Sequence, residues 1–102
     1  HQPELATTGG LTEMRKIAAL LAVYGLPLVP HANETSRNAI HLLFAQPARI
    51  APLAEWGIKI NHNFQHFFKD FYEPVNGYFE LPTGNGFGYE IDPAKIVNRV
   101  EL

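Results

Sequence analysis

The sequence predicts an α/β protein in which short strands alternate with helices over the first 58 residues. Apolar residues recur at helical spacing across residues 11–24 and again across residues 36–46. Short apolar runs at residues 28–29 and 53–56 have the length of strands. In addition, an ionisable residue stands at the end of each of three successive apolar or proline-marked runs, which is the layout of a barrel-type active site.

These three residues are Glu4, His31 and Glu55. Parallel strands that are joined by right-handed helical crossovers place all their carboxyl ends on one side of the sheet. Polar groups at those ends therefore converge on one pocket. We expect Glu4, His31 and Glu55 to lie in such a pocket.

Each predicted helix has recognisable ends. Residues 11–24 carry Glu13 in the first turn, where an acidic side chain is favourable, and are followed by Gly25 as a stop signal. Residues 36–46 follow several N-cap candidates and end before Pro47. The apolar positions of the first helix are Leu11, Met14, Ile17, Ala18, Leu21 and Tyr24.

Beyond residue 58 the alternation gives way to an aromatic, histidine-bearing stretch. We therefore divide the chain into a barrel-type part, residues 1–58, and a closing segment, residues 59–102. The local elements expected in the closing segment are a turn at residues 75–78, short strands at residues 78–81 and 88–91, and a last helix that begins at Asp92 and Pro93.

Composition excludes several functional classes. The 102 residues are 46% hydrophobic and 18% charged with a formal net charge of -2, so neither nucleic acid nor an anionic membrane surface is an expected partner. The absence of cysteine excludes a disulfide framework and a thiolate metal site. No apolar run approaches the roughly 20 residues that span a bilayer. We expect a soluble protein.

The three ionisable residues suggest proton-transfer chemistry. Histidine titrates near neutral pH, and a carboxylate bonded to one ring nitrogen fixes the tautomer and makes the other nitrogen more basic. Glu4 and His31 could form such a pair, with Glu55 across the pocket. The residues alone also leave a structural interpretation open. In it, Glu4 is a loop carboxylate, His31 caps a helix and Glu55 is a surface charge.

Other histidines and glycines are weaker candidates. His62 and His66 lie four residues apart, but two ligands do not make a metal site, and Asn63 stands where the zinc-protease helix motif needs a glutamate. Interleaved phenylalanines favour a packing role instead. We expect His41 to be a hydrogen-bonded core or interface residue, and residues 84–88 to be a hairpin loop rather than a phosphate loop.

Several short strings, spread along essentially the whole chain, resemble those of one enzyme family. They are Gln2-Pro3-Glu4 with Gly9-Gly10-Leu11, Val29-Pro30-His31-Ala32-Asn33, Leu53-Ala54-Glu55-Trp56, Val75-Asn76-Gly77, Leu81-Pro82 and Gly86-Phe87-Gly88. With this pattern the chain resembles the C-terminal part of the mandelate racemase group in the enolase superfamily. The 27 residues from Glu4 to His31 match the family's separation between its acid and its histidine. Within the group the chain looks most like the acid-sugar dehydratases.

The resemblance implies a modified TIM (β/α)7β barrel with an α+β capping domain. This chain would supply barrel strands six to eight, and residues 59–102 would pack on the capping domain. The beginning of the protein would then lie upstream. By the same resemblance the complete enzyme is expected to be a cytoplasmic homo-oligomer.

The resemblance also implies a reaction. A Mg²⁺-dependent enzyme of this kind removes the proton next to the substrate carboxylate and eliminates the β-hydroxyl, which gives a 2-keto-3-deoxy sugar acid. His31 would be the base, or the acid that expels the hydroxyl, Glu4 would orient it, and Glu55 would donate a hydrogen bond to the substrate carboxylate. Asn33 and Trp56 would contact the acid sugar.

The Mg²⁺ ligands would come from strands upstream of this chain, and none is expected here. Glu4 departs from the family pattern, which has aspartate at this position, and the added methylene moves the carboxylate. Two alternatives stay open. One is a racemase or epimerase of the same superfamily, and the other is a non-catalytic binding module that folds alone.

Overall fold

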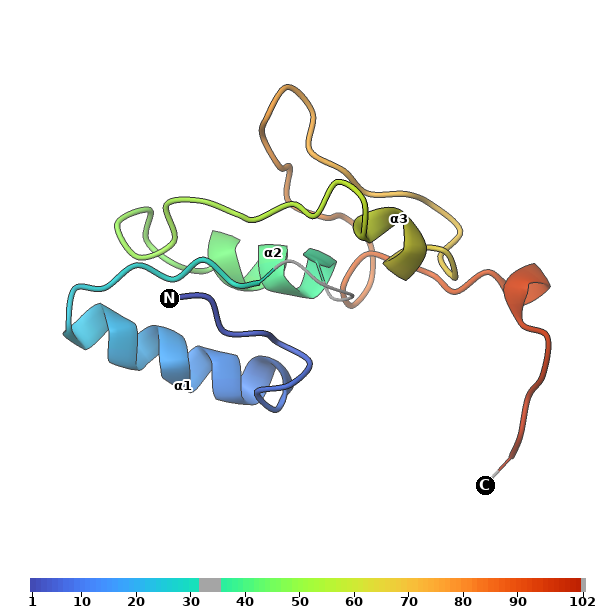
Figure 1. The fold of residues 1–102 in the computed structure, drawn as a ribbon, viewed down its shortest axis with the longest axis horizontal. Helices are drawn as coiled ribbons and strands as arrows, with labels where there is room; N and C mark the ends of the chain where they lie inside the picture. Colours follow the sequence, from blue (N-terminus) through green and yellow to red (C-terminus); the bar gives the residue numbers. More distant parts are fainter. Residues whose placement is uncertain (32–35, 102) are drawn as a thin grey trace.

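The computed structural model describes residues 1–31 and 36–101. Its helical elements are α1 (Gly10–Val23), α2 (Ser36–Phe44), α3 (Asn61–Phe64) and the 3₁₀ helix η1 (Pro93–Lys95). Helices α1 and α2 lie against each other near the N-terminal segment, and the chain beyond η1 extends away from them (Figure 1). None of the described helices combines the length and the apolar character that a membrane span requires.

Helix α1 confirms the predicted helix to within one residue at each end. It buries Met14, Ala18 and Leu21, which share one face at the expected spacing. The helix ends as the glycine signal predicted, because Gly25 adopts a left-handed φ of 64° and donates its N–H to Ala22 O at 3.3 Å. The next N–H, that of Leu26, bonds to Leu21 O at 2.9 Å, which completes a Schellman motif.

The core lies where α1, α2 and the extended segments meet. Its buried members are Leu5, Met14, Ala18, Leu21, Leu28, Ala39, Leu42 and Ile50. The second predicted helix is also confirmed at its start, although α2 ends at Phe44, two residues earlier than expected. Tyr24, the last apolar position of the first pattern, is 70% exposed and adds nothing to this core.

The predicted strands at residues 28–29 and 53–56 are wrong as regular strands, since residues 1–31 and 36–101 contain no named β-strand. A partial parallel ladder takes their place. Val29 N donates to His1 O at 2.9 Å and His31 N to Pro3 O at 3.1 Å, while Leu28 N donates to Ile50 O at 2.7 Å on the other side.

Proline explains why this ladder is incomplete. A parallel register alternates donors between the two chains, so the missing bonds would need the N–H groups of residues 3, 30 and 52. All three are proline, which has no N–H. The segments thus run side by side in parallel register, and the ladder lacks the three bonds that these residues would donate.

The closing segment has turns and isolated bridges instead of the strands predicted at residues 78–81 and 88–91. The turn at residues 75–78 is confirmed: Val75 and Tyr78 exchange backbone bonds of 2.8 and 3.0 Å, and Asn76 and Gly77 both have positive φ. A second bridge joins Phe68 to Ile91. The division at residue 58 stays a prediction.

The last predicted helix begins as expected but is short. The Asp92 side chain accepts a hydrogen bond from Ala94 N at 3.1 Å, as an N-cap does, and Pro93 opens the first turn. Only the three residues of η1 follow. The predicted start is thus confirmed, and the element is a single 3₁₀ turn.

The loop at residues 84–88 gives a test of this fold. Gly86 and Gly88 both have left-handed φ, at 61° and 72°, but a Cβ on Gly88 would lie 2.3 Å from Thr83 O, whereas one on Gly86 meets nothing within 4 Å. Gly86→Ala should cost about 1–2 kcal/mol, the usual penalty of an L-residue in this region. Gly88→Ala should cost clearly more, because backbone must also move. Equal losses in denaturant unfolding of the two variants would contradict this loop geometry.

Candidate active site

The structure brings His31 and Glu55 together as a hydrogen-bonded pair. His31 Nδ1 lies 2.8 Å from Glu55 Oε2, and the two side chains are 47% and 35% exposed. His31 ends the central extended segment and Glu55 lies in the third, so neighbouring segments present the two groups to each other. The sequence predicted their convergence, but it assigned the bond on His31 to Glu4.

The electrostatics of the pair favour a protonated imidazole. The hydrogen bond from His31 to Glu55 raises the pKa of His31 above 6.5, and the charge of Glu55 adds to this effect. Partial desolvation of the ring opposes the increase. The charge of Glu4 raises the pKa further, so the predicted acid acts on His31 across space.

Glu4 lies at the start of a turn that leads into α1. Its backbone carbonyl accepts hydrogen bonds from Thr8 N at 3.0 Å and from the Thr8 hydroxyl at 2.7 Å. Gly9 and Gly10, both with positive φ, then begin the helix. The turn therefore fixes the backbone of Glu4 beside the pair, and the Glu4 side chain is half-buried there.

Gln2 is a member of the site that the sequence reasoning did not single out. Its Nε2 donates to Glu55 Oε2 at 3.4 Å, which is the same oxygen that His31 contacts. The available signal was its position two residues before Glu4. In an extended segment residues two apart share a face, so any site that includes Glu4 should include Gln2.

Trp56 faces the opposite side of its segment from Glu55, as alternation requires. Its ring packs edge-on against Phe71 and Phe79, with centroids 6.2 and 5.5 Å away. It also lines an apolar groove of about 560 Å³, whose walls include Leu43, Phe44, Leu53, Pro74 and Phe79. The structure thus separates Trp56 from the His31–Glu55 pair. Asn33, the other predicted substrate contact, lies outside the described residues.

Three other histidines, His41, His62 and His66, pack against aromatic rings. His62 stacks on Phe71 with centroids 4.5 Å apart and planes at 8°, and His66 meets Phe67 edge-on. His41 is hydrogen-bonded as predicted, with its Nε2 3.3 Å from Phe87 O. Within residues 1–31 and 36–101, no three His, Asp or Glu side chains lie close enough together to hold a metal ion.

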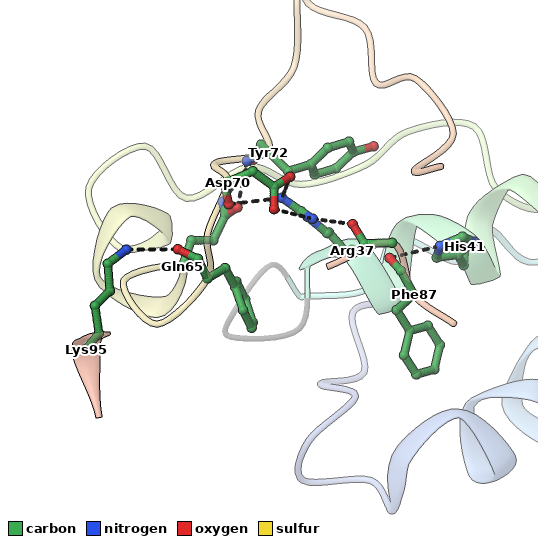
Figure 2. A network of polar contacts seen from close by, with 9 residues as sticks. Arg37, His41, Gln65, Asp70, Tyr72, Phe87 and Lys95 are labelled. Carbon is green, nitrogen blue, oxygen red and sulfur yellow. Dashed lines mark hydrogen bonds and ion pairs between the residues drawn. The ribbon is translucent and has the colours of Figure 1, made fainter. Parts of the chain in front are cut away.

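A buried arginine joins α2 to the closing segment. Arg37, only 4% exposed, contacts Asp70 Oδ2 at 2.8 Å and Asp70 O at 3.2 Å, and it also donates to Gly88 O. Arg37 belongs to the first turn of α2, and Figure 2 shows its guanidinium beside Asp70 and near Tyr72. Its carbon lies 5.2 Å from the centre of the Tyr72 ring, a cation–π distance.

Sequence reasoning missed this network. One signal was available, because Arg37 stands three residues before the buried Ile40 and therefore on an inward face of α2. Tyr72 and Gln65 complete the arrangement through a two-way amide pair, with both bonds at 2.8 Å. Burial raises the pKa of the Tyr72 hydroxyl to about 12.

Parallel extended segments that alternate with helices and carry polar groups at their carboxyl ends are typical of TIM-barrel enzymes. A family model described as "Enolase C-terminal domain-like" matches residues 1–95, so the chain belongs to this family. The family predicted from the sequence is therefore confirmed.

Individual proteins of known activity are also similar to this chain. The chain is 33% identical over 90 residues to an arabinonate dehydratase of Saccharolobus solfataricus, which covers 88% of this chain and 24% of that protein. It is 34% identical over 100 residues to a D-galactarolactone cycloisomerase of Agrobacterium fabrum, covering 89% of this chain and 26% of that protein. A crystal structure of L-rhamnonate dehydratase from Gibberella zeae matches with a TM-score of 0.72 and 33% identity, over 91% of this chain and 25% of that one. The chain thus spans about a quarter of the length of these relatives.

The raised pKa of His31 predicts a pH-dependent contribution to stability. Because the pKa is raised in the folded state, the contribution is fully present below the ordinary value of 6.5 and is lost as the pH rises through the folded value. Glu55→Gln should therefore lower stability in mildly acidic buffer and have little effect above that window. Denaturant unfolding of both proteins across this range measures the difference, and a difference that is constant with pH would contradict the pairing.

The Arg37 network predicts an asymmetry between ion pairs. Asp70→Ala should cost about 1.5–3 kcal/mol, since it leaves the buried guanidinium without its carboxylate. Glu90→Ala is the matched control and should cost clearly less, because Glu90 pairs with Lys69 where both side chains are mostly exposed and water screens the charges. Urea unfolding of the complete protein compares the two, and similar losses would show that Arg37 does not depend on Asp70.

Proposed function

We propose that this chain is the C-terminal part of an acid-sugar dehydratase of the mandelate racemase group. The enzyme would remove the proton next to a carboxylate and eliminate the β-hydroxyl, with a 2-keto-3-deoxy sugar acid and water as products. The observation that carries the proposal is the His31–Glu55 pair at the ends of neighbouring parallel segments. The dehydratases among the relatives support the reaction class.

In this proposal His31 is the proton-transfer group. Glu55 occupies Nδ1 at 2.8 Å, so Nε2 is the nitrogen that can accept the α-proton. The bond also keeps the imidazole in one orientation and stabilises its positive charge after transfer. The same nitrogen can then return a proton to the departing hydroxyl, which leaves as water.

The two carboxylates have separate roles in this proposal. Glu55 orients His31, the function that the sequence had assigned to Glu4. Glu4 acts as a second negative charge near the ring, in agreement with its effect on the pKa of His31. Trp56 lies in a different environment, so its contribution to substrate binding would be indirect.

The rest of the proposal concerns parts outside this chain. The described residues form no three-ligand cluster, so they do not fit a Mg²⁺ site and its ligands would come from elsewhere in the protein. Residues 59–102 would pack on an α+β capping domain in a cytoplasmic homo-oligomer. Exposed apolar side chains support a covering by further structure, among them Leu53 at 69% and Val97 at 96%.

A second candidate is proton transfer without elimination, as in a racemase, an epimerase or an isomerase. The similarity to a D-galactarolactone cycloisomerase supports this second candidate. A non-catalytic binding module is the remaining alternative. Because residues 1–95 match an enzyme family, this alternative has less support than the two catalytic ones.

The test uses the complete protein with a panel of sugar acids and Mg²⁺. His31→Asn should reduce turnover by roughly 10²–10⁴-fold, the contribution of a general acid–base group. His66→Asn is the control and should retain activity, because His66 packs on Phe67 in the closing segment. Unchanged turnover in His31→Asn would refute the assigned role.

The products separate the two candidates. A dehydratase forms a 2-keto acid, which reacts with semicarbazide, and its formation is accompanied by loss of the β-hydroxyl. A racemase or epimerase in D₂O instead incorporates deuterium at the α-carbon with the hydroxyl retained. Neither product from any sugar acid tested would favour the binding module.

A further inference from the structure

Gln2 and His31 meet the same atom of Glu55. His31 Nδ1 lies 2.8 Å and Gln2 Nε2 3.4 Å from Glu55 Oε2. The three side chains come from three neighbouring extended segments of the chain. Gln2 thus adds a third member to a contact that the proposed mechanism describes as a pair.

The backbone holds Gln2 in this place from both sides. The carbonyl before it, His1 O, accepts from Val29 N at 2.9 Å, and the carbonyl after it, Pro3 O, accepts from His31 N at 3.1 Å. Gln2 is therefore fixed in register with the segment that ends at His31. A side chain of glutamine length then reaches the third segment.

The chemistry of the amide suits a fixed support. Its N–H₂ donates to a carboxylate without carrying charge and without titrating in the physiological range. A donor on Oε2 restrains rotation of the Glu55 carboxylate, and the restrained oxygen is the one that contacts His31. An acidic or basic side chain at this position would instead change the charge beside the imidazole.

We propose that Gln2 is a positioning residue that holds the Glu55 carboxylate against Nδ1 of His31. The inference deepens the proposed function, since it concerns the same site, but its geometry stands without any substrate. Among residues 1–31 and 36–101, the ionisable groups that shift the pKa of His31 are Glu55, through its bond and its charge, and Glu4, through its charge. Gln2 acts on His31 through Glu55.

The experiment measures the pKa of His31 in the complete protein by hydrogen–deuterium exchange at the imidazole C2 position with mass spectrometry. Gln2→Met keeps the length of the side chain and removes the donor. The bond to Glu55 is the largest cause of the raised pKa of His31, so loosening it should lower that pKa. Gln2→Glu places a further carboxylate beside the pair and should raise it.

Two controls show whether a change is specific. Gln46→Met makes the same replacement in the groove that Trp56 lines, and it should leave His31 unchanged. The exchange rate of His66, observed in the same spectra, should be the same in all variants. A pKa of His31 that stays constant or rises in Gln2→Met would overturn the proposal.

The outcome separates this inference from the proposed function. If no sugar acid is turned over but the pKa of His31 falls in Gln2→Met, the positioning role stands and the dehydratase assignment fails. If a sugar acid is turned over, Gln2→Met should lower kcat more than it changes KM. The loss should be smaller than the roughly 10²–10⁴-fold loss expected for His31→Asn. A change in KM alone would assign Gln2 to substrate binding instead.

Discussion

The buried guanidinium of Arg37 is the contact on which the second half of the structure depends. A charge that is 4% exposed must be paired and hydrogen-bonded to be tolerated. Arg37 meets this requirement with groups from two distant stretches, Asp70 and Gly88, and with aromatic faces above it. The closing segment has only isolated bridges and short helical turns among its described residues. The contacts of Arg37 hold residues 68–72 and 87–89 against α2, as a regular sheet holds its strands together in other folds.

The sequence predicted features that depend on neighbours along the chain and missed those that depend on register. Both main helices, the Schellman end at Gly25 and the Asp92 cap were predictable from local signals. The interruption of the ladder was not, because Pro3, Pro30 and Pro52 remove bonds only once the three segments are aligned. The same limit applies to Arg37, whose partners lie 33 and 51 residues away.

Register also explains what could be predicted of the site. Residues at the ends of parallel segments converge whatever the detailed pairing, so Glu4, His31 and Glu55 were found as a group. Which carboxylate bonds to His31 depends on side-chain reach and on the loops that carry each acid. The sequence could not decide this, and the structure favours Glu55. The position of Trp56, in contrast, was predictable from the sequence. Because Trp56 follows Glu55 directly in an extended segment, its side chain lies on the opposite face.

Glutamate in place of the family's aspartate at position 4 need not cost His31 its negatively charged surroundings. The pKa of the imidazole is raised first by the bond to Glu55, and the charge of Glu4 adds a smaller increase from its place in the turn before α1. An acid in either position favours the imidazolium, since both interactions stabilise the positive charge. A site with two carboxylates can therefore change the one that orients the ring and keep the imidazole basic, as the proposed proton transfer would require. In the proposed site, this redundancy would allow a side chain one methylene longer at position 4.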